Sequence, residues 1–243
     1  ATQDDYQINV PSSFENYKII KELGNGSTCV TVLVENQDTN QEYAAKIISK
    51  KNIIGNRYYQ SIINEYKILN RISHQNIIKF IEMLEITNDE EEEFIIFIIE
   101  YCSNGDLLTY ISENDVDEKT KKRIIHEMLS AVKYLHENEI SHGDIKVENI
   151  LLDSELHAKL CDFGYCRTSV IAGDDSKSGT LYYAAPELFL PFISFNTLKS
   201  DIYAIGITIF AIFELCFPFK DGDQACIIKQ ILSGEFSTSK KMN

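Results

Sequence analysis

Basic residues are scarce in this chain of 243 residues, with 23 lysines and arginines against 37 aspartates and glutamates. The formal charge of −14 argues against general binding of nucleic acids or anionic membranes, because both attract a basic surface. Such acidity suits a basic partner, although acidity that serves only solubility explains it as well. We therefore expect neither nucleic acid nor membrane among the partners.

Cysteine pairs and a secretory signal are also missing. The spacing of the six cysteines fits neither a Cys-x-x-Cys metal pair nor a compact disulfide scaffold. Residues 1–11 do not show a charged start followed by an apolar segment. We expect reduced thiols in a cytoplasmic or nuclear protein that is not secreted.

A long apolar run is absent where the sequence is most hydrophobic. Residues 204–213 give about ten apolar positions before Glu214, whereas a membrane span needs about twenty. This segment is predicted to be a buried core helix, not a transmembrane one. We also find no internal repeat and no low-complexity linker, and the length fits one large domain or two small lobes.

Hydrophobic periodicity changes near residue 100. Before it, β-branched alternation predicts strands at 17–23, 31–35, 42–49, 77–86 and 94–100, with one helix at 58–71. After it, helices are predicted at 118–138, 200–215 and 224–233. The acidic run 89–93 is expected to be a solvated hairpin tip. The expected fold class is α+β, with an N-terminal arm at 1–16, a small antiparallel sheet lobe at 17–100 and a mainly helical lobe at 101–243.

A glycine-rich stretch, Leu23-Gly24-Asn25-Gly26, lies between the first two predicted strands. Glycine lets backbone N–H groups approach phosphate oxygens without a Cβ in the way. A plain hairpin turn explains the stretch as well, because Cys29 stands where a third glycine would complete the motif. A strand follows it, so it is not the dinucleotide-binding fingerprint, which opens a helix.

A strand lysine, Lys46, follows about twenty residues later. A lone lysine in a strand usually faces solvent. Here Glu65 falls on the polar side of the next predicted helix, where it could pair with Lys46. That pairing would leave Lys46 placed to neutralise phosphate charge.

The strongest pattern places Asp144, Lys146 and Asn149 in a short loop after a long helix, followed by Asp162-Phe163-Gly164. Oxygen atoms from Asn149 and Asp162 suit Mg²⁺, which prefers oxygen ligands and shares them with phosphates. Asp144 could accept a hydroxyl proton, and Lys146 could balance charge on a moving phosphoryl group. An ordinary polar loop explains any one of these residues, but not the set in this order.

Together with Ala185-Pro186-Glu187, these motifs stand in the order that protein kinases show, and the chain resembles that family over about residues 17–235. The resemblance implies a bilobal fold with ATP between the lobes, Mg²⁺ as cofactor and a protein or peptide substrate. Lys146 and the stretch 179–187 resemble the serine/threonine pattern, and this stretch is most similar to calmodulin-dependent and AMP-activated kinases.

The resemblance also assigns residues. It implies catalytic or positioning roles for Asp144, Lys146, Lys46, Glu65 and Thr180, with Thr180 bonded to Asp144 and Lys146. Residues 100–102 would be the hinge on adenine, and Leu69, Phe80, His142 and Phe163 would form the hydrophobic spine. The acidic Asp106 and Glu148 suggest a peptide with basic residues before the acceptor. The implied ATP-binding set is Leu23, Gly24, Asn25, Gly26, Thr31, Ala44, Lys46, Glu100, Cys102, Asp106 and Leu151, and the metal ligands are Asn149 and Asp162.

One departure from the pattern is Gly143, where many kinases carry an arginine that pairs with a phosphate on the activation loop. The loop 165–184 offers Thr168, Ser169, Ser176 and Ser178 as acceptors. Our hypothesis is that activity depends little on phosphorylation of this loop.

The second departure is the C-terminal part. Only 24 residues follow Phe219, and the last arginine is Arg167, so Glu187 lacks the downstream arginine that usually holds it. We expect an excised fragment with an incomplete helical lobe, a costly unpaired carboxylate at Glu187 and exposed apolar surface around 200–215, or a dimer that covers it. The alternative to an enzyme is a pseudokinase or inactive fragment that acts as a binding module. The sequence lacks a Walker lysine, so it does not support a nucleotide-binding protein of another class.

Overall fold

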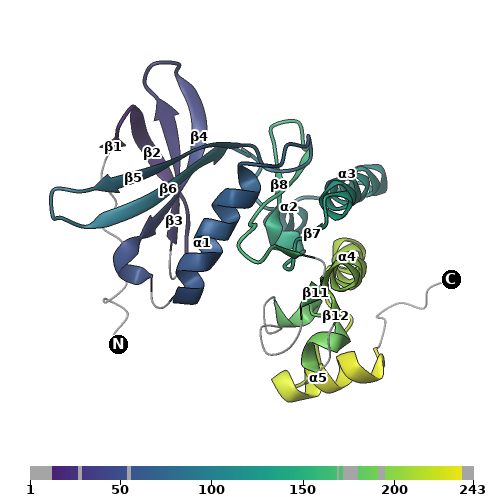
Figure 1. The fold of residues 1–243 in the computed structure, drawn as a ribbon. Coiled ribbons are helices and arrows are strands. Elements are labelled where there is room, and N and C mark those ends of the chain that lie inside the picture. Colours follow the sequence, from purple (N-terminus) through teal and green to yellow (C-terminus); the bar gives the residue numbers. More distant parts are fainter. Residues whose placement is uncertain are drawn as a thin grey trace. The chain divides into compact units, whose positions relative to one another are not determined.

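The computed structural model describes residues 13–26, 29–53, 56–168, 170–171, 180–190 and 195–236. The chain divides into two compact units (Figure 1). The first comprises residues up to Ser73 together with Ile78–Ser103, and the second comprises His74–Ile77 and the residues from Asn104 onward. The division near residue 103 lies close to the change in periodicity, although His74–Ile77 belongs to the second unit.

A six-stranded antiparallel sheet forms most of the first unit, in the order β1-β2-β3-β4-β6-β5. Alternate side chains build a core on each face, as the period of two requires. Val30, Val32 and Val34 pack in one cluster, while Ile95 and Phe97 pack with Ile62 of α1 in the other. The elements are β1 (Ser13–Phe14), β2 (Tyr17–Asn25), β3 (Cys29–Asn36), β4 (Gln41–Ser49), α1 (Asn56–Leu69), β5 (Phe80–Thr87) and β6 (Glu93–Glu100).

Two expectations for the first unit need correction. Phe14 is 5% exposed and pairs with Tyr17, so residues 13–14 belong to the sheet and not to a loose arm. The strand expected from residue 77 begins at Phe80, because Ile77 bridges Leu160 in the second unit instead. The acidic run is a hairpin turn as expected, with the side-chain oxygen of Asn88 accepting two backbone N–H groups.

The second unit is mainly helical, with short strand pairs that position its loops. Its described helices are α2 (Leu107–Glu113), α3 (Glu118–Glu137), α4 (Thr197–Glu214) and α5 (Gln224–Ser233). Three antiparallel pairs join β7 (Ile140–Ser141) to β10 (Arg167–Thr168), β8 (Ile150–Leu152) to β9 (Ala158–Leu160), and β11 (Val170–Ile171) to β12 (Phe195–Asn196). The second unit also contains short 3-10 turns, namely η3 (Val147–Asn149), η5 (Leu181–Tyr183) and η6 (Pro186–Phe189).

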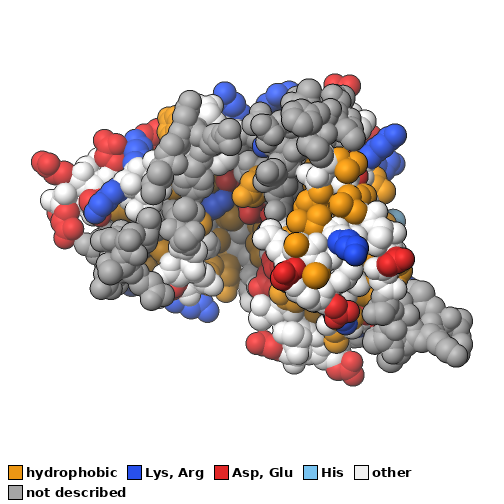
Figure 2. Space-filling view, turned by 90° about the horizontal axis from the view of Figure 1, so that it is seen from below, with side chains coloured by type: hydrophobic (Ala, Val, Ile, Leu, Met, Phe, Trp, Pro, Cys, Tyr) orange, Lys and Arg blue, Asp and Glu red, His pale blue; other side chains and the backbone are white. Residues whose placement is uncertain are grey.

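Helix α4 supports part of the expectation for the C-terminal region. Ile202 and Leu215 are 58% and 61% exposed, and Figure 2 shows apolar side chains at the surface among the charged ones. Glu187, however, is only partly buried, and its carboxylate accepts a hydrogen bond from the Ser200 hydroxyl at 2.8 Å. The expected unpaired carboxylate is therefore wrong. Among the described helices, none is long and apolar enough to cross a membrane.

Candidate active site

The loop between β7 and η3 carries the candidate base. Asp144 is 5% exposed and lies within hydrogen-bond distance of three other polar side chains. Its Oδ2 lies 2.7 Å from Lys146 Nζ and accepts from Asn149 Nδ2 at 3.0 Å. Its Oδ1 accepts both from the backbone N–H and from the hydroxyl of Thr180, each at 3.1 Å. Four residues expected to act together are thus in one buried network.

Lys146 ties this network together. Its Nζ also donates to Thr180 Oγ1 at 2.9 Å, so the contacts expected of Thr180 with Asp144 and Lys146 are both present. Burial alone would lower the pKa of Lys146, but the hydrogen bond and charge of Asp144, with the charges of Glu148 and Asp162, raise the pKa above its ordinary value. The ammonium therefore stays charged at neutral pH.

The candidate metal ligands are Asn149, at the end of η3, and Asp162, on backbone of unusual conformation. Asn149 Nδ2 donates to the backbone carbonyl of Asp144 at 2.8 Å as well as to its carboxylate, so the amide oxygen is the atom that can bind a cation. Asp162 has φ +64°, a left-handed conformation that Asp adopts more readily than most residues. No group of three or more His, Cys, Asp or Glu within the described ranges is placed to hold a metal, so these oxygens would need phosphate or water as further ligands.

A buried carboxylate that sequence reasoning missed holds this loop from behind. Asp201 of α4 is 2% exposed and accepts from the backbone N–H groups of His142 at 2.8 Å and Gly143 at 2.9 Å. Its Oδ2 also lies 2.8 Å from His136 Nε2. The signal in the sequence was an acidic residue next to the apolar stretch of α4, because a buried charge needs partners.

A second contact that was not foreseen lies beside the loop. The Tyr183 hydroxyl donates to Glu148 at 2.9 Å. Burial and the charge of Glu148 raise the pKa of Tyr183, which keeps its proton for this bond. Phe217 stacks on Tyr182, with ring centroids 4.9 Å apart, and packs edge-on against Tyr183. The stretch 181–183 is thereby fixed by aromatic packing.

The expected pair in the first unit is present. Lys46 Nζ of β4 donates to both carboxylate oxygens of Glu65 in α1, each at 2.9 Å. Glu65 is 5% exposed, so the pair is shielded from water. Thr31 pairs with Lys46 across the β3–β4 ladder, which places both on the sheet.

The glycine-rich stretch is a hairpin end. Leu23, Gly24 and Asn25 complete β2, and the Gly26 N–H donates to the Cys29 carbonyl at 2.9 Å. Leu23 is 39% exposed. Residues 27 and 28 of this loop, and residues 169 and 172–179 of the activation loop with Ser169, Ser176 and Ser178, lie outside the described residues. The side chain of Thr168 also lies outside them.

The residues expected around the nucleotide base belong to both units. In the first unit Ala44 is buried, and Glu100 accepts the Lys79 N–H through its side chain at 2.7 Å. In the second unit Asp106 bridges Leu151, while its carboxylate caps α2 by accepting from Thr109. Cys102 is buried at the end of the first unit. The carboxylate of Asp106 would have to leave its capping bonds to reach a ribose.

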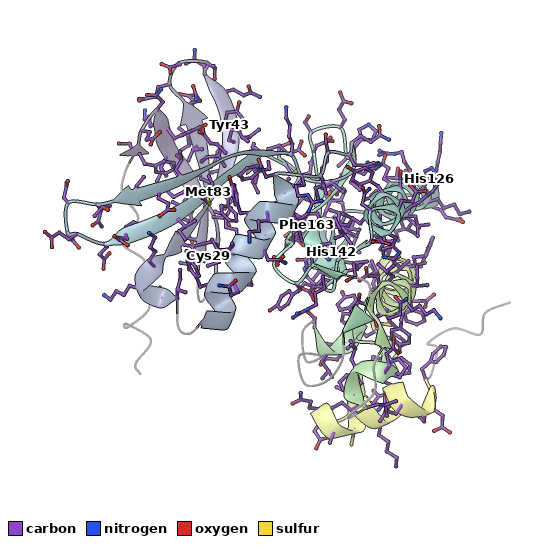
Figure 3. The ribbon with its side chains drawn as sticks, in the orientation of Figure 1. Cys29, Tyr43, Met83, His126, His142 and Phe163 are labelled. Carbon is purple, nitrogen blue, oxygen red and sulfur yellow. The ribbon has the colours of Figure 1, made fainter. Side chains whose placement is uncertain are left out.

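The spine residues of the second unit contact one another. His142 and Phe163, labelled in Figure 3, pack edge to face with ring centroids 5.1 Å apart, and both are fully buried. His142 Nε2 lies 3.0 Å from the Cys161 carbonyl oxygen. In the first unit, Leu69 is 4% exposed and Phe80 packs edge-on against Phe97. Simple core packing explains the positions of Leu69 and Phe80 equally well.

Known proteins match this chain over most of its length. The protein kinase domain model matches residues 17–242. The 3-phosphoinositide-dependent protein kinase 1 of Rattus norvegicus is 32% identical over 235 residues, which are 93% of this chain and 40% of that protein. Calcium-dependent protein kinase 4 of Plasmodium berghei is 32% identical over 92% of this chain and 42% of its own. CBL-interacting serine/threonine-protein kinase 12 of Arabidopsis thaliana is 30% identical, with 90% and 45% covered.

The chain spans less than half the length of these relatives. Because kinases with such different names match at nearly the same identity, the expected likeness to calmodulin-dependent and AMP-activated kinases stays a prediction. The family match, by contrast, covers both units and every motif described above. The chain therefore belongs to the protein kinase domain family.

Proposed function

We propose that this chain transfers the γ-phosphoryl group of ATP to serine or threonine hydroxyls of proteins. The observation that carries the proposal is the buried network of Asp144, Lys146, Thr180 and Asn149. Phosphoryl transfer needs little covalent chemistry from the protein, so positioned charges and hydrogen bonds supply most of the rate enhancement.

Asp144 would orient the substrate hydroxyl and accept its proton. Lys146, whose raised pKa keeps it charged, would balance the negative charge of the phosphoryl group in transfer. In the first unit, Glu65 holds the ammonium of Lys46 through two hydrogen bonds, and Lys46 would bind phosphate oxygens of ATP. Each role uses an atom that the network or the ion pair already positions.

Asn149 and Asp162 fit a magnesium site by their chemistry. The amide nitrogen of Asn149 is committed to Asp144, which turns the amide oxygen into the available ligand. Mg²⁺ prefers one or two protein oxygens together with phosphates and water. An ion held by Asn149 and Asp162 would supply positive charge against the negative charge of the phosphates.

The proposed substrate is a peptide that carries basic residues before the acceptor. Glu148 supports this, because it lies two residues beyond Lys146 and receives only one described hydrogen bond at Oε2, from Tyr183. The net charge of −14 would also attract a basic peptide over longer distances. We place the reaction in the cytoplasm or nucleus, with neither a nucleic acid nor a membrane as partner, and a dimer through α4 remains part of the proposal.

The test is transfer of labelled phosphate from ATP to a basic peptide. Asp144→Asn should reduce the rate by about 10²- to 10⁴-fold, the usual contribution of a positioned general base. Asp162→Ala and chelation of Mg²⁺ should each abolish transfer. The exposed Asp115→Asn is the matched control and should retain the wild-type rate. Equal transfer by the wild type, Asp144→Asn and Asp162→Ala would refute the proposal.

The second candidate is a pseudokinase that binds partners without turnover. Its support is the apolar surface of α4, where Ile202 and Phe213 are 58% and 38% exposed. A partner of such a binding module would cover this surface. A wild-type chain that binds ATP with Mg²⁺ but transfers no phosphate to any peptide of a randomised library would favour this candidate. Preference for acidic peptides in that library would instead refute only the substrate proposal.

A further inference from the structure

The dipeptide Asn25-Gly26 lies at the hairpin end of the glycine-rich stretch, and both of its residues are exposed. Within the described part of the chain, the Asn25 side chain forms no hydrogen bond, so its amide group is free to rotate. The Gly26 N–H donates to the carbonyl of Cys29, a residue labelled in Figure 3, at 2.9 Å. This single bond closes the hairpin end, and a local opening of the hairpin breaks it.

An asparagine that precedes a glycine can form a ring without a catalyst. The Gly26 nitrogen loses its proton and attacks Cγ of Asn25, so a nitrogen–carbon bond forms while the bond from Cγ to Nδ2 breaks. Nδ2 leaves as ammonia and takes the proton with it. Water then opens the ring, at Cγ to give aspartate or at the backbone carbonyl to give isoaspartate, and no atom is oxidised or reduced. Glycine favours the attack because it has no Cβ in the way.

The same dipeptide occurs at Asn104-Gly105, where hydrogen bonds hold it more firmly. Asn104 is partly buried, and its Nδ2 donates to the Asp153 carbonyl at 2.6 Å. Its backbone N–H donates to the Leu152 carbonyl at 3.1 Å, and the Gly105 carbonyl accepts from the Leu152 N–H at 2.8 Å. Ring closure at Asn104 must therefore break a bond to the leaving amide group itself, whereas ring closure at Asn25 need not.

The ladders of the sheet place Asn25 near the lysine that is proposed to bind phosphate. Gly24 pairs with Thr31, and Thr31 pairs with Lys46 in the next strand. Two strand spacings, or roughly 10 Å, therefore separate the backbone of Gly24 from that of Lys46. A negative charge on the residue after Gly24 would repel phosphates bound at Lys46, because salt screens such a distance only in part.

We infer that Asn25-Gly26 is a site of spontaneous deamidation whose products weaken the binding of ATP. The inference rests on the proposed function for the roles of Lys46 and the glycine-rich stretch in binding phosphate. Aspartate adds a negative charge. Isoaspartate adds the same charge and also inserts one carbon into the backbone that pairs with Val30. Both products oppose the close approach of backbone N–H groups to phosphate oxygens.

Peptide mapping by mass spectrometry tests the modification without any need for activity. The folded protein is incubated at neutral pH, and the conversion of Asn25 and Asn104 is followed in the same sample. Asn25 should convert about tenfold faster, because ring closure at Asn104 must also break the bond to Asp153. Equal rates at the two sites, or conversion at Asn104 alone, would overturn the inference.

The unfolded chain is the control for that comparison. In guanidinium chloride, Asn25 and Asn104 should convert at similar rates, because both precede a glycine and only the fold distinguishes them. A difference that persists in the unfolded chain would contradict the protection that we assign to the hydrogen bonds of Asn104.

Gly26→Ala tests the attack by the Gly26 nitrogen. A Cβ built on Gly26 lies 3.5 Å from the Cys29 carbonyl oxygen, which is ordinary contact, so alanine fits the hairpin. Its methyl group obstructs the attacking nitrogen, and conversion of Asn25 should slow on the order of tenfold. Conversion of Asn104 in the same variant should keep the wild-type rate. An unchanged rate at Asn25 would contradict ring closure through this nitrogen.

Direct binding of ATP with Mg²⁺ tests the consequence. Asn25→Asp should raise the Kd for ATP about two- to fivefold, as one partly screened negative charge would. Asn40→Asp is the matched control, because it adds the same charge at an exposed position in the turn between β3 and β4, and its Kd should equal that of the wild type. A wild-type Kd in Asn25→Asp, or an equal rise in both variants, would overturn the inference.

Incubation connects the two measurements. The Kd of the wild type should rise as Asn25 converts, while that of Asn25→Gln should stay at its own starting value, because the longer glutamine side chain forms the ring far less readily. An equal rise in both proteins would contradict the inference. If the wild type binds ATP but transfers no phosphate, the proposed function fails, while the mapping and the Kd values still decide the inference.

Discussion

In the first unit, Lys46 and Glu65 lie on a strand and a helix, and a single ion pair joins them. In the second unit, Asp144 and Lys146 lie on a loop and Asn149 ends a 3-10 turn, and hydrogen bonds together with the Asp144–Lys146 ion pair connect their side chains. Regular elements obtain their geometry from backbone ladders and packing, so one side-chain pair suffices there. An irregular loop needs many polar contacts, and removal of one should affect the others.

The largest effect should follow from Asp201→Asn in the second unit. The amide has one acceptor oxygen, which leaves the N–H of His142 or Gly143 unpaired in a buried place. We expect a loss of about 3 kcal/mol in the free energy of unfolding and a strong loss of phosphate transfer. Chemical denaturation and the peptide assay measure both.

Asp153→Asn is the matched control for Asp201→Asn. Asp153 also accepts two backbone N–H groups, from Glu155 and His157, but both bond Oδ1, which the asparagine amide oxygen can replace, and the side chain is 24% exposed. A loss of less than about 1 kcal/mol is expected. Equal losses in the two variants would contradict the argument that Asp201 must use both oxygens in a buried place.

A smaller effect is expected from Glu65→Gln in the first unit. The change removes the charge that holds Lys46 but leaves a polar side chain of the same size, so we expect destabilisation by about 1.5–2 kcal/mol. The KM for ATP should rise about tenfold. The exposed pair of Glu85 with Lys50 supplies the control, since Glu85→Gln should cost less than about 1 kcal/mol. A KM for ATP that stays at the wild-type value would contradict the role of the pair.

Leu215→Gly should stabilise the second unit modestly. Leu215 ends α4 at φ +53° and is 61% exposed, so glycine removes a steric cost and loses little apolar burial. After the greater chain entropy of glycine in the unfolded state is subtracted, a gain of about 0.5–1 kcal/mol remains. Leu129→Gly within α3 should instead destabilise by about 1 kcal/mol or more. Thermal melting distinguishes the two signs.

The smallest effect concerns pH. Burial lowers the pKa of His74, whose Nδ1 accepts the Asn76 N–H at 3.1 Å and whose ring stacks on Tyr134. The fold thus favours neutral His74, and its contribution to stability is complete above the ordinary pKa near 6.5 and declines as pH falls below it. His74→Gln should flatten the decline of melting temperature between pH 7 and pH 5.

The exposed His126, labelled in Figure 3, gives the control for that titration. His126→Gln should leave the pH dependence of melting unchanged, because this side chain is exposed at the surface. An unchanged slope in His74→Gln would remove His74 as the cause.

Periodicity predicted the long elements well because burial alone determines their pattern. The helix at Gln224–Ser233 was predicted to the residue, and the strands of the sheet differ by a few residues at their ends. Helix α2 was not predicted, since its seven residues are too few for a 3.6-residue period to show. Its signal was local, namely the capping of the Thr109 N–H by Asp106.

The site was predictable where motifs are local and not where partners are distant in sequence. Asp144, Lys146 and Asn149 stand within six residues, and Thr180 was expected to join them. The contact of Asp201 with His142 spans 59 residues and requires the packing of α4 against the loop. For Glu187 the sequence suggested a missing partner, because it could not show that Ser200 lies within reach.

The carboxylate of Asp144 has a consequence for the choice of substrate. Both of its oxygens already accept hydrogen bonds, Oδ1 from Thr180 and Oδ2 from Asn149 and Lys146. In the proposed reaction an incoming hydroxyl must therefore compete with the protein's own donors. In that reaction, the flanking residues of a peptide must contribute enough binding energy to compensate for the displaced hydrogen bonds of Asp144. A water molecule or a small alcohol has no such residues, so the resting network would disfavour both as acceptors.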